Sequence, residues 1–171
     1  DRHRSALQER MDGLQEREAA REAALRELQT AVLLLQRPGG GESLGEFSRQ
    51  IRAAGSPEEL VELNRRLPEL AGALLCSGSR AEAVNRFVTL NADVVLETLL
   101  RFALQRLGPA PIDFAFLIMG SEGRREQTLC TDQDNALLYA DPPAGQGEAV
   151  AGYFRRLGEF VCSWLNEAGY S

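Results

Sequence analysis

A chain of 171 residues, 44% of them hydrophobic, has room for one domain or two small ones with a buried core. Its formal net charge of -6 at pH 7 argues against nucleic-acid binding, which needs a basic surface. Three widely spaced cysteines and a single histidine argue against disulfides and a zinc site, as expected of a cytoplasmic protein. No apolar run approaches the ~20 residues that span a bilayer, so we expect no membrane partner.

Residues 5–36 are predicted to form one long helix. Apolar residues fill most positions of two interleaved seven-residue series: Leu7, Met11, Leu14, Leu25, Leu28, Val32 and Leu35. This spacing is typical of a coiled-coil seam, which Glu18 and Arg21 interrupt in the middle. We expect either a coiled coil, which would pair two copies as a homodimer or connect to an upstream domain, or an amphipathic helix that packs on its own domain.

The segment that follows is predicted to be helical as well. An Arg-Pro-Gly-Gly-Gly sequence at 37–41 first breaks the helical pattern, and a short helix is then expected over 44–54. Ser56 predicts the N-cap and capping box of the next helix. This helix should reach about residue 75, and Pro68 is expected to kink or divide it.

The second half of the chain changes from a helical to a strand pattern. Ser79 begins another capping-box sequence, which predicts a long buried helix to about Leu107. A continuous apolar run over 112–119 then predicts a buried strand, and 135–140 predicts a second strand. Helical spacing returns over 148–168. Its predicted apolar face consists of Val150, Phe154, Leu157, Val161 and Leu165.

These elements predict an α+β fold. We expect a connector or coiled-coil helix over 1–37, a helical region over 42–107 that forms a helical bundle, and a β-turn-β-α core over 108–171. Two strands alone do not make a stable sheet, so further strands must lie beyond the chain's end or come from a partner. The core is therefore expected to be truncated at its C-terminus.

Two aspartates at the start of the second predicted strand are candidate metal ligands. Asp132 and Asp134 are two residues apart, so an extended backbone directs both carboxylates to one face. Two adjacent carboxylates repel each other unless a cation lies between them, and Mg²⁺ prefers such oxygen ligands. An isolated pair of this kind also caps or solvates loops. With the turn that precedes it, the pair predicts a catalytic site for two Mg²⁺ ions, or Mn²⁺ in their place.

That turn predicts a binding site for a nucleoside triphosphate. Gly120 allows close backbone approach, and a short helix beginning near Ser121 would direct free N–H groups and a hydroxyl at a phosphate. Arg124 and Arg125 are cationic donors, one for the ligand and the other for a structural carboxylate. An ordinary turn is the alternative for Gly120 and Ser121 taken alone.

Four neighbouring residues are predicted to support these groups. Glu126 is expected to orient one of the two arginines, and Gln127 and Thr131 are expected to bind the loop or Asp132. Asn135 is expected to orient a metal-binding carboxylate, because ligating carboxylates are themselves hydrogen-bonded.

Residues 120–127 (GSEGRREQ) followed by residues 131–136 (TDQDNA) resemble the signature of a bacterial family of nucleotidyltransferases. The resemblance covers roughly residues 44–171. The family is similar to the catalytic domain of the PII-protein uridylyltransferase and belongs to the polymerase-beta-like superfamily. In many members the domain follows CBS or cyclic-nucleotide-binding modules.

The resemblance implies an incomplete polymerase-beta-like nucleotidyltransferase core. Its reaction would transfer a nucleoside monophosphate from a nucleoside triphosphate to an acceptor, a protein in signal transduction. The resemblance assigns the triphosphate to Gly120 and Ser121, and the magnesium ions to Asp132 and Asp134.

The chain departs from the superfamily in one respect. Sites of this kind use a third carboxylate from a later strand, and Asp141 lies about 20 Å from Asp134 at the rise of a strand. We therefore expect the third acid beyond Ser171. The alternative function is a non-catalytic module that senses nucleotides or dimerises in a signalling protein. The missing acid and the seven-residue repeat of 5–36 favour that alternative.

Overall fold

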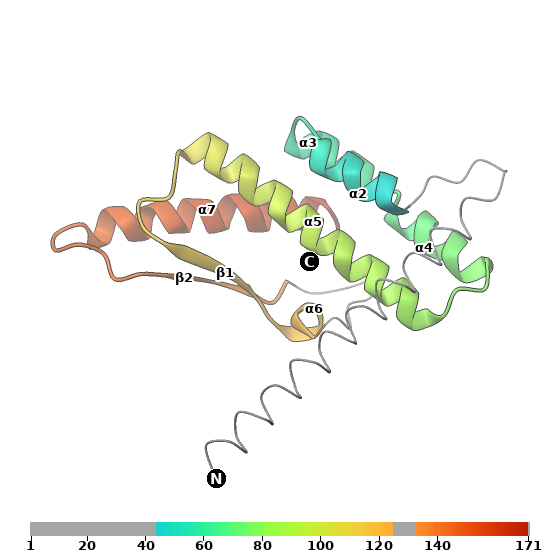
Figure 1. The fold of residues 1–171 in the computed structure, drawn as a ribbon. Coiled ribbons are helices and arrows are strands. Elements are labelled where there is room, and N and C mark those ends of the chain that lie inside the picture. Colours follow the sequence, from blue (N-terminus) through green and yellow to red (C-terminus); the bar gives the residue numbers. More distant parts are fainter. Residues whose placement is uncertain (1–43, 125–132, 171) are drawn as a thin grey trace, which may run out of the picture. The chain divides into compact units, whose positions relative to one another are not determined.

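The computed structural model describes residues 44–124 and 133–170, which belong to one compact unit, Leu44–Ser171 (Figure 1). The described part combines helices with a two-stranded antiparallel sheet, and is therefore α+β as expected. The predicted helix over 5–36, with its coiled-coil and homodimer interpretations, lies outside the described residues. Among the helices that are described, none has the length and apolar character needed to cross a membrane.

The first three helices of the described part follow the sequence pattern closely. They are α2 (Leu44–Ala53), α3 (Pro57–Asn64) and α4 (Leu67–Cys76). The Ser56 side chain accepts a hydrogen bond from the backbone of Glu59, which confirms the predicted N-cap, while the Glu59 carboxylate accepts one from Gly55 N. Pro68 divides the predicted helix because it lies in the first turn of α4, where its missing N–H costs nothing.

Helix α5 (Ala81–Leu107) begins later than the capping-box pattern predicts. Its N-cap is Arg80, and no side-chain hydrogen bond caps it, so the Ser79 prediction is wrong. Gly78 has a φ of +90°, and Ser79 N donates to Leu74 O, so Ser79 belongs to the turn that closes α4. The expected apolar residues are buried: Val84, Phe87, Val88, Val94, Val95, Leu99 and Phe102.

The two predicted strands pair antiparallel. They are β1 (Phe114–Ile118) and β2 (Asn135–Tyr139), with Phe114 opposite Tyr139 and Ile118 opposite Asn135. The prediction of a buried strand over 112–119 is wrong, because exposure alternates along β1. The helices cover one face of the sheet, so every second side chain points away from them.

Helix α7 (Gly147–Glu167) covers the inner face of the sheet and lies alongside α5 (Figure 1). The five residues predicted for its apolar face are all buried. Phe154 stacks on Tyr139 with ring centroids 4.5 Å apart, and its centroid lies 5.3 Å from that of Phe114. Both strands therefore pack on α7 through the ring of Phe154.

A buried polar connection joins the helices. A polar residue such as Asn91 is usually found on an exposed helix face, but its side chain is fully buried in α5. Its amide donates to Asn64 Oδ1 at 2.7 Å, and Asn64 Nδ2 donates to Ala168 O at 2.9 Å. Asn64 of α3 supplies the acceptor that makes burial of the Asn91 amide tolerable, and Asn64 is in turn bonded to the residue that follows α7.

We predict that Phe154→Ala will lower the free energy of unfolding by about 3–5 kcal/mol, the usual cost of removing a buried phenylalanine. Phe160→Ala on the same helix is the matched control, because that side chain is only half-buried. Urea denaturation of both variants would measure the difference. An equal loss for the two variants would contradict the central role of Phe154.

Candidate functional site

The structure brings together the ends of the two strands that carry the predicted site. Beyond the last β1–β2 residue pair, Met119 N donates to Asp134 O at 2.7 Å, which extends the ladder by one step. Gly120 follows directly, so its backbone lies beside Asp134. The proximity of these two residues follows from the antiparallel pairing, since the end of β1 meets the start of β2.

Gly120 is required at this point by its backbone and by its neighbour. Its φ of +59° lies in the left-handed region, which side chains with a Cβ rarely adopt. A Cβ added to Gly120 would lie 2.0 Å from Oδ2 of Asp134. The predicted close approach at Gly120 is thus an approach by the Asp134 carboxylate, and any other residue would displace that carboxylate or the turn.

A single helical turn, α6 (Gly120–Gly123), follows. Gly123 N donates to Met119 O at 3.0 Å, and Arg124 N donates to Gly120 O at 3.3 Å. A Cβ added to Gly123 would lie 2.8 Å from Ile118 O, so glycine allows the tight packing of this turn. Arg124 is exposed at the end of the turn.

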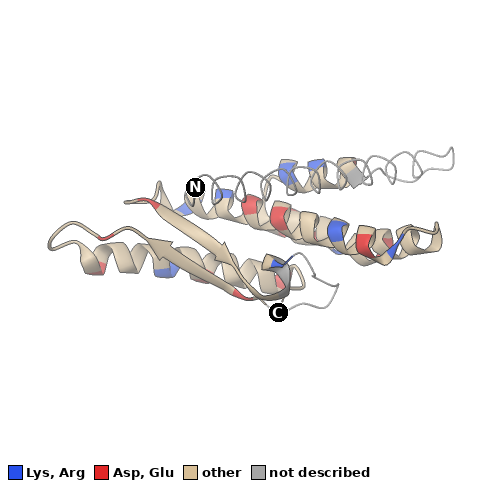
Figure 2. Ribbon diagram, turned by 60° about the horizontal axis from the view of Figure 1, so that its bottom comes forward, with Lys and Arg blue, Asp and Glu red and all other residues tan. Residues whose placement is uncertain are grey.

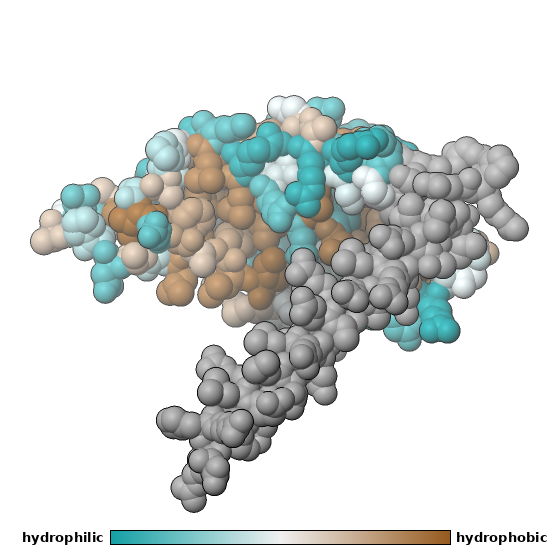
Figure 3. Space-filling view, in the orientation of Figure 1, coloured by the Kyte–Doolittle hydropathy of each residue, from teal (hydrophilic) through white to brown (hydrophobic). Residues whose placement is uncertain are grey.

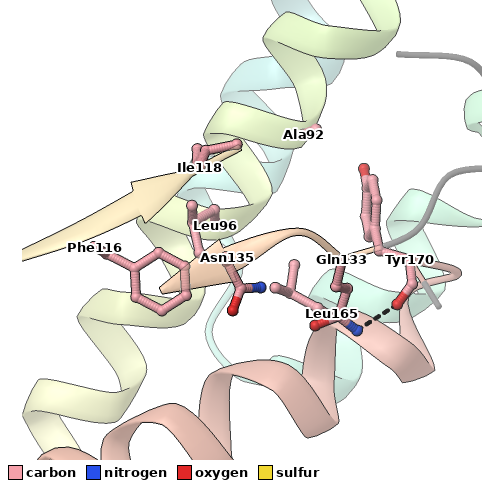
Figure 4. Close-up of a pocket in the computed structure, with 8 residues that line it drawn as sticks. All are labelled: Ala92, Leu96, Phe116, Ile118, Gln133, Asn135, Leu165 and Tyr170. Atoms are coloured by element: carbon pink, nitrogen blue, oxygen red, sulfur yellow. Dashed lines mark hydrogen bonds between the residues drawn. The ribbon is translucent and has the colours of Figure 1, made fainter. Parts of the chain in front are cut away.

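Side chains at the start of β2 alternate between the two faces of the sheet. Gln133 and Asn135 point to the inner face, where both line a small cavity between the sheet and helices α5 and α7 (Figure 4). The residue between them, Asp134, has an exposed side chain and lies against Gly120. The alternation is the one that the sequence predicts for an extended segment.

The inner face is already filled by the protein's own groups. The Gln133 Nε2 group donates to Cys162 O at 3.2 Å and to Tyr170 O, and the Cys162 thiol donates to Asn135 Oδ1 at 3.6 Å. The cavity beside them has room for about one water molecule. A nucleotide therefore does not fit on this face, and the outer face that carries Asp134 remains.

The environment of Cys162 agrees with its role as a hydrogen-bond donor. Burial raises the pKa of the Cys162 thiol, and the hydrogen bond to Asn135 partly offsets that rise. The thiol is therefore kept protonated at neutral pH. Asn135, which was predicted to orient a carboxylate, accepts this bond on the face opposite to Asp134.

Several predicted site residues lie outside the described part of the chain. They are Arg125, Glu126, Gln127, Thr131 and Asp132, together with the side chain of Ser121. Among the residues that the structure describes, no group of three or more His, Cys, Asp or Glu side chains comes close enough to hold a metal ion. The described part of the site is thus the pair Gly120 and Asp134, with Arg124 nearby in sequence.

The outer face of the sheet beside Asp134 is apolar and exposed. Neither strand contains a charged residue (Figure 2), and hydrophobic residues gather over both strands (Figure 3). Leu117 is 41% exposed, Met119 48% and Leu138 62%. A carboxylate at the edge of an apolar surface of this kind is accessible to a ligand.

The match to known protein families decides the wider assignment. The family model described as "Putative nucleotidyltransferase DUF294" matches residues 65–171, which is most of the chain and includes both strands and the turn between them. The chain belongs to this family. Comparisons with curated proteins and with solved structures gave no match.

Within this nucleotidyltransferase family member, the sequence reasoning missed Gln133 and Cys162 as parts of the site's framework. An uncharged amide between two acids was the available signal for Gln133, because alternation turns it toward the core. No signal in the sequence alone pointed to Cys162, because its contact with Asn135 joins distant segments.

We predict that Gly120→Ala will destabilise the protein more than Gly145→Ala. Both glycines have positive φ, +59° and +80°, but nothing lies within 4 Å of a Cβ added to Gly145. The Gly145 variant should lose about 1–2 kcal/mol from backbone strain, and the Gly120 variant about 1–3 kcal/mol more from its clash with Asp134.

Chemical denaturation would measure both losses. The double variant Gly120→Ala/Asp134→Ala should regain part of the additional loss, since it removes the clashing oxygen. Equal losses for the two alanine variants would show that the carboxylate does not lie against Gly120.

Proposed function

We propose that this protein is a metal-dependent nucleotidyltransferase that transfers a nucleoside monophosphate from a nucleoside triphosphate to an acceptor, with pyrophosphate leaving. The family match supports the general kind of reaction. The observation that carries the proposal is the contact of the Asp134 carboxylate with the Gly120 turn. It joins a metal-binding group to the backbone segment proposed for the phosphates.

Asp134 is proposed as a metal ligand, with Asp132 as the second. The donor set fits Mg²⁺, because Asp134 is an exposed carboxylate and both residues offer oxygen ligands. Bound magnesium would supply charge neutralisation at the triphosphate and activation of the acceptor hydroxyl. The backbone of Asp134 is held in place by a hydrogen bond from Met119 N to the Asp134 carbonyl oxygen.

The triphosphate is proposed to bind at the turn after β1. We assign phosphate contacts there to the backbone of Gly120 and to Ser121, Arg124 and Arg125, next to the Asp134 carboxylate that lies against Gly120. Glu126, Gln127 and Thr131 would hold this segment in place. The filled inner face supports a ligand on the outer face, where Asp134 lies.

A protein is proposed as the acceptor, in a cytoplasmic signalling pathway. The resemblance to the PII-protein uridylyltransferase implies a protein side chain as the acceptor of a polymerase-beta-like core. The exposed apolar surface of Leu117, Met119 and Leu138 beside Asp134 supports a macromolecular acceptor, since such surfaces mark sites of protein interaction.

We expect one of ATP, GTP, CTP and UTP to raise the melting temperature of the protein in the presence of Mg²⁺. A ligand at a hundred times its dissociation constant stabilises the folded state by about 2.7 kcal/mol. Asp134→Asn should abolish the rise, because the amide cannot replace a charged metal ligand. Asp141→Asn, a change of an exposed acid beyond the far end of β2, should leave it unchanged.

The nucleotide found in this way would then be used to assay pyrophosphate release. Nucleotide binding without pyrophosphate release from any acceptor would favour a nucleotide-sensing module over an enzyme. The proposal fails if no nucleotide gives a magnesium-dependent shift, or if Asp134→Asn and the parent protein respond equally.

A further inference from the structure

The side chain of Gln133 ties the acid-bearing segment to the far end of the chain. Its Nε2 group donates to Tyr170 O just after α7 (Figure 4) and also to Cys162 O within that helix. Both acceptors are backbone carbonyls near the C-terminal end of α7, where the helix dipole places partial negative charge and favours a donor. A glutamine amide supplies two N–H groups without adding a charge to the half-buried site.

The anchor that Gln133 reaches is itself held in place. Asn64 of α3 donates to Ala168 O at 2.9 Å, and Tyr170 N donates to Leu165 O at 3.0 Å. The turn at 168–170 therefore belongs to the packed helical layer. A bond from Gln133 to this turn transmits the position of that layer to the start of β2.

Holding Gln133 inward also determines where its neighbour points. In an extended segment adjacent side chains lie on opposite faces, and a shift of one residue would exchange the two faces. Asn135 is held inward as well, by its bond from Cys162. Asp134 lies between two inward anchors, so its carboxylate is directed to the outer face and against Gly120.

We propose that Gln133 is the positioning residue of the metal site, and that it sets the register and facing of the Asp134 carboxylate by binding the end of α7. This inference rests on the proposed function, because it assigns Asp134 to metal binding. Gln133 does not touch the ligand; it acts through Asp134. An apolar residue would remove the donor, and a glutamate would place a carboxylate against two carbonyl oxygens.

The test compares Gln133→Leu and Gln133→Glu with Tyr153→Phe, all in the full chain. Tyr153→Phe removes the 2.7 Å hydrogen bond from α7 to Gly108 O, far along that helix from the turn that Gln133 binds, so it is the control for general destabilisation. Mn²⁺ alone is the probe, titrated while electron paramagnetic resonance follows the free ion. The exchange rate of the Met119 amide proton, which bonds to Asp134 O, reports the register without any ligand.

We expect both Gln133 variants to bind Mn²⁺ about 10- to 100-fold more weakly, the usual effect of removing a group that orients a metal ligand. The Met119 amide should exchange about tenfold faster in these variants. Tyr153→Phe should lower the melting temperature and leave the Mn²⁺ affinity unchanged.

Two results would overturn the inference. One is that the Gln133 variants keep the parent's Mn²⁺ affinity and Met119 exchange rate; the other is an equal loss of Mn²⁺ affinity in Tyr153→Phe at the same melting temperature. If the parent protein itself binds no Mn²⁺, the proposed function fails. Met119 exchange then still decides whether Gln133 sets the register.

Discussion

Packing of the sheet onto Phe154 is the interaction on which the rest of this structure depends. A two-stranded ribbon is marginal in water, and here its inner face is buried because the ring of Phe154 contacts Phe114 of β1 and Tyr139 of β2. Once one face of the ribbon is covered, the other must face outward. Asp134 lies on that outward side. The chemistry of the site thus depends on aromatic packing at the opposite end of the strands.

Apolar contacts hold one end of the two-stranded sheet, and polar contacts hold the other. The aromatic cluster near Phe154 supplies apolar contacts, and apolar burial depends little on direction. The hydrogen bonds of Gln133 and Asn135 at the other end are directional and require one alignment. Between the two ends, Gly158 of α7 faces β2, where a Cβ added to it would reach ordinary contact distance, 3.4 Å, from Leu137 Cδ1.

Local patterns in the sequence predicted most elements, because periodicity, capping and proline act over a few residues. Pro68 and Ser56 are examples, and the strand ends at Gly120 and Asp134 were predicted to carry the site. Local patterns carry no information where a residue distant in the sequence decides the outcome. Asn91 is buried because Asn64 of α3 is its partner. Gln133 is held by Tyr170 at the end of α7, and local sequence patterns show neither contact.

The buried pair Asn64 and Asn91 has a consequence for how this protein can evolve. Each amide is the other's partner inside the helical layer, and Asn64 also holds the turn of α7 that receives Gln133. Replacing one of them alone leaves a polar group buried without its partner, which costs more than replacing both with apolar groups. Positions 64 and 91 should therefore change together among relatives, and an apolar pair there would require another way of fastening the end of α7.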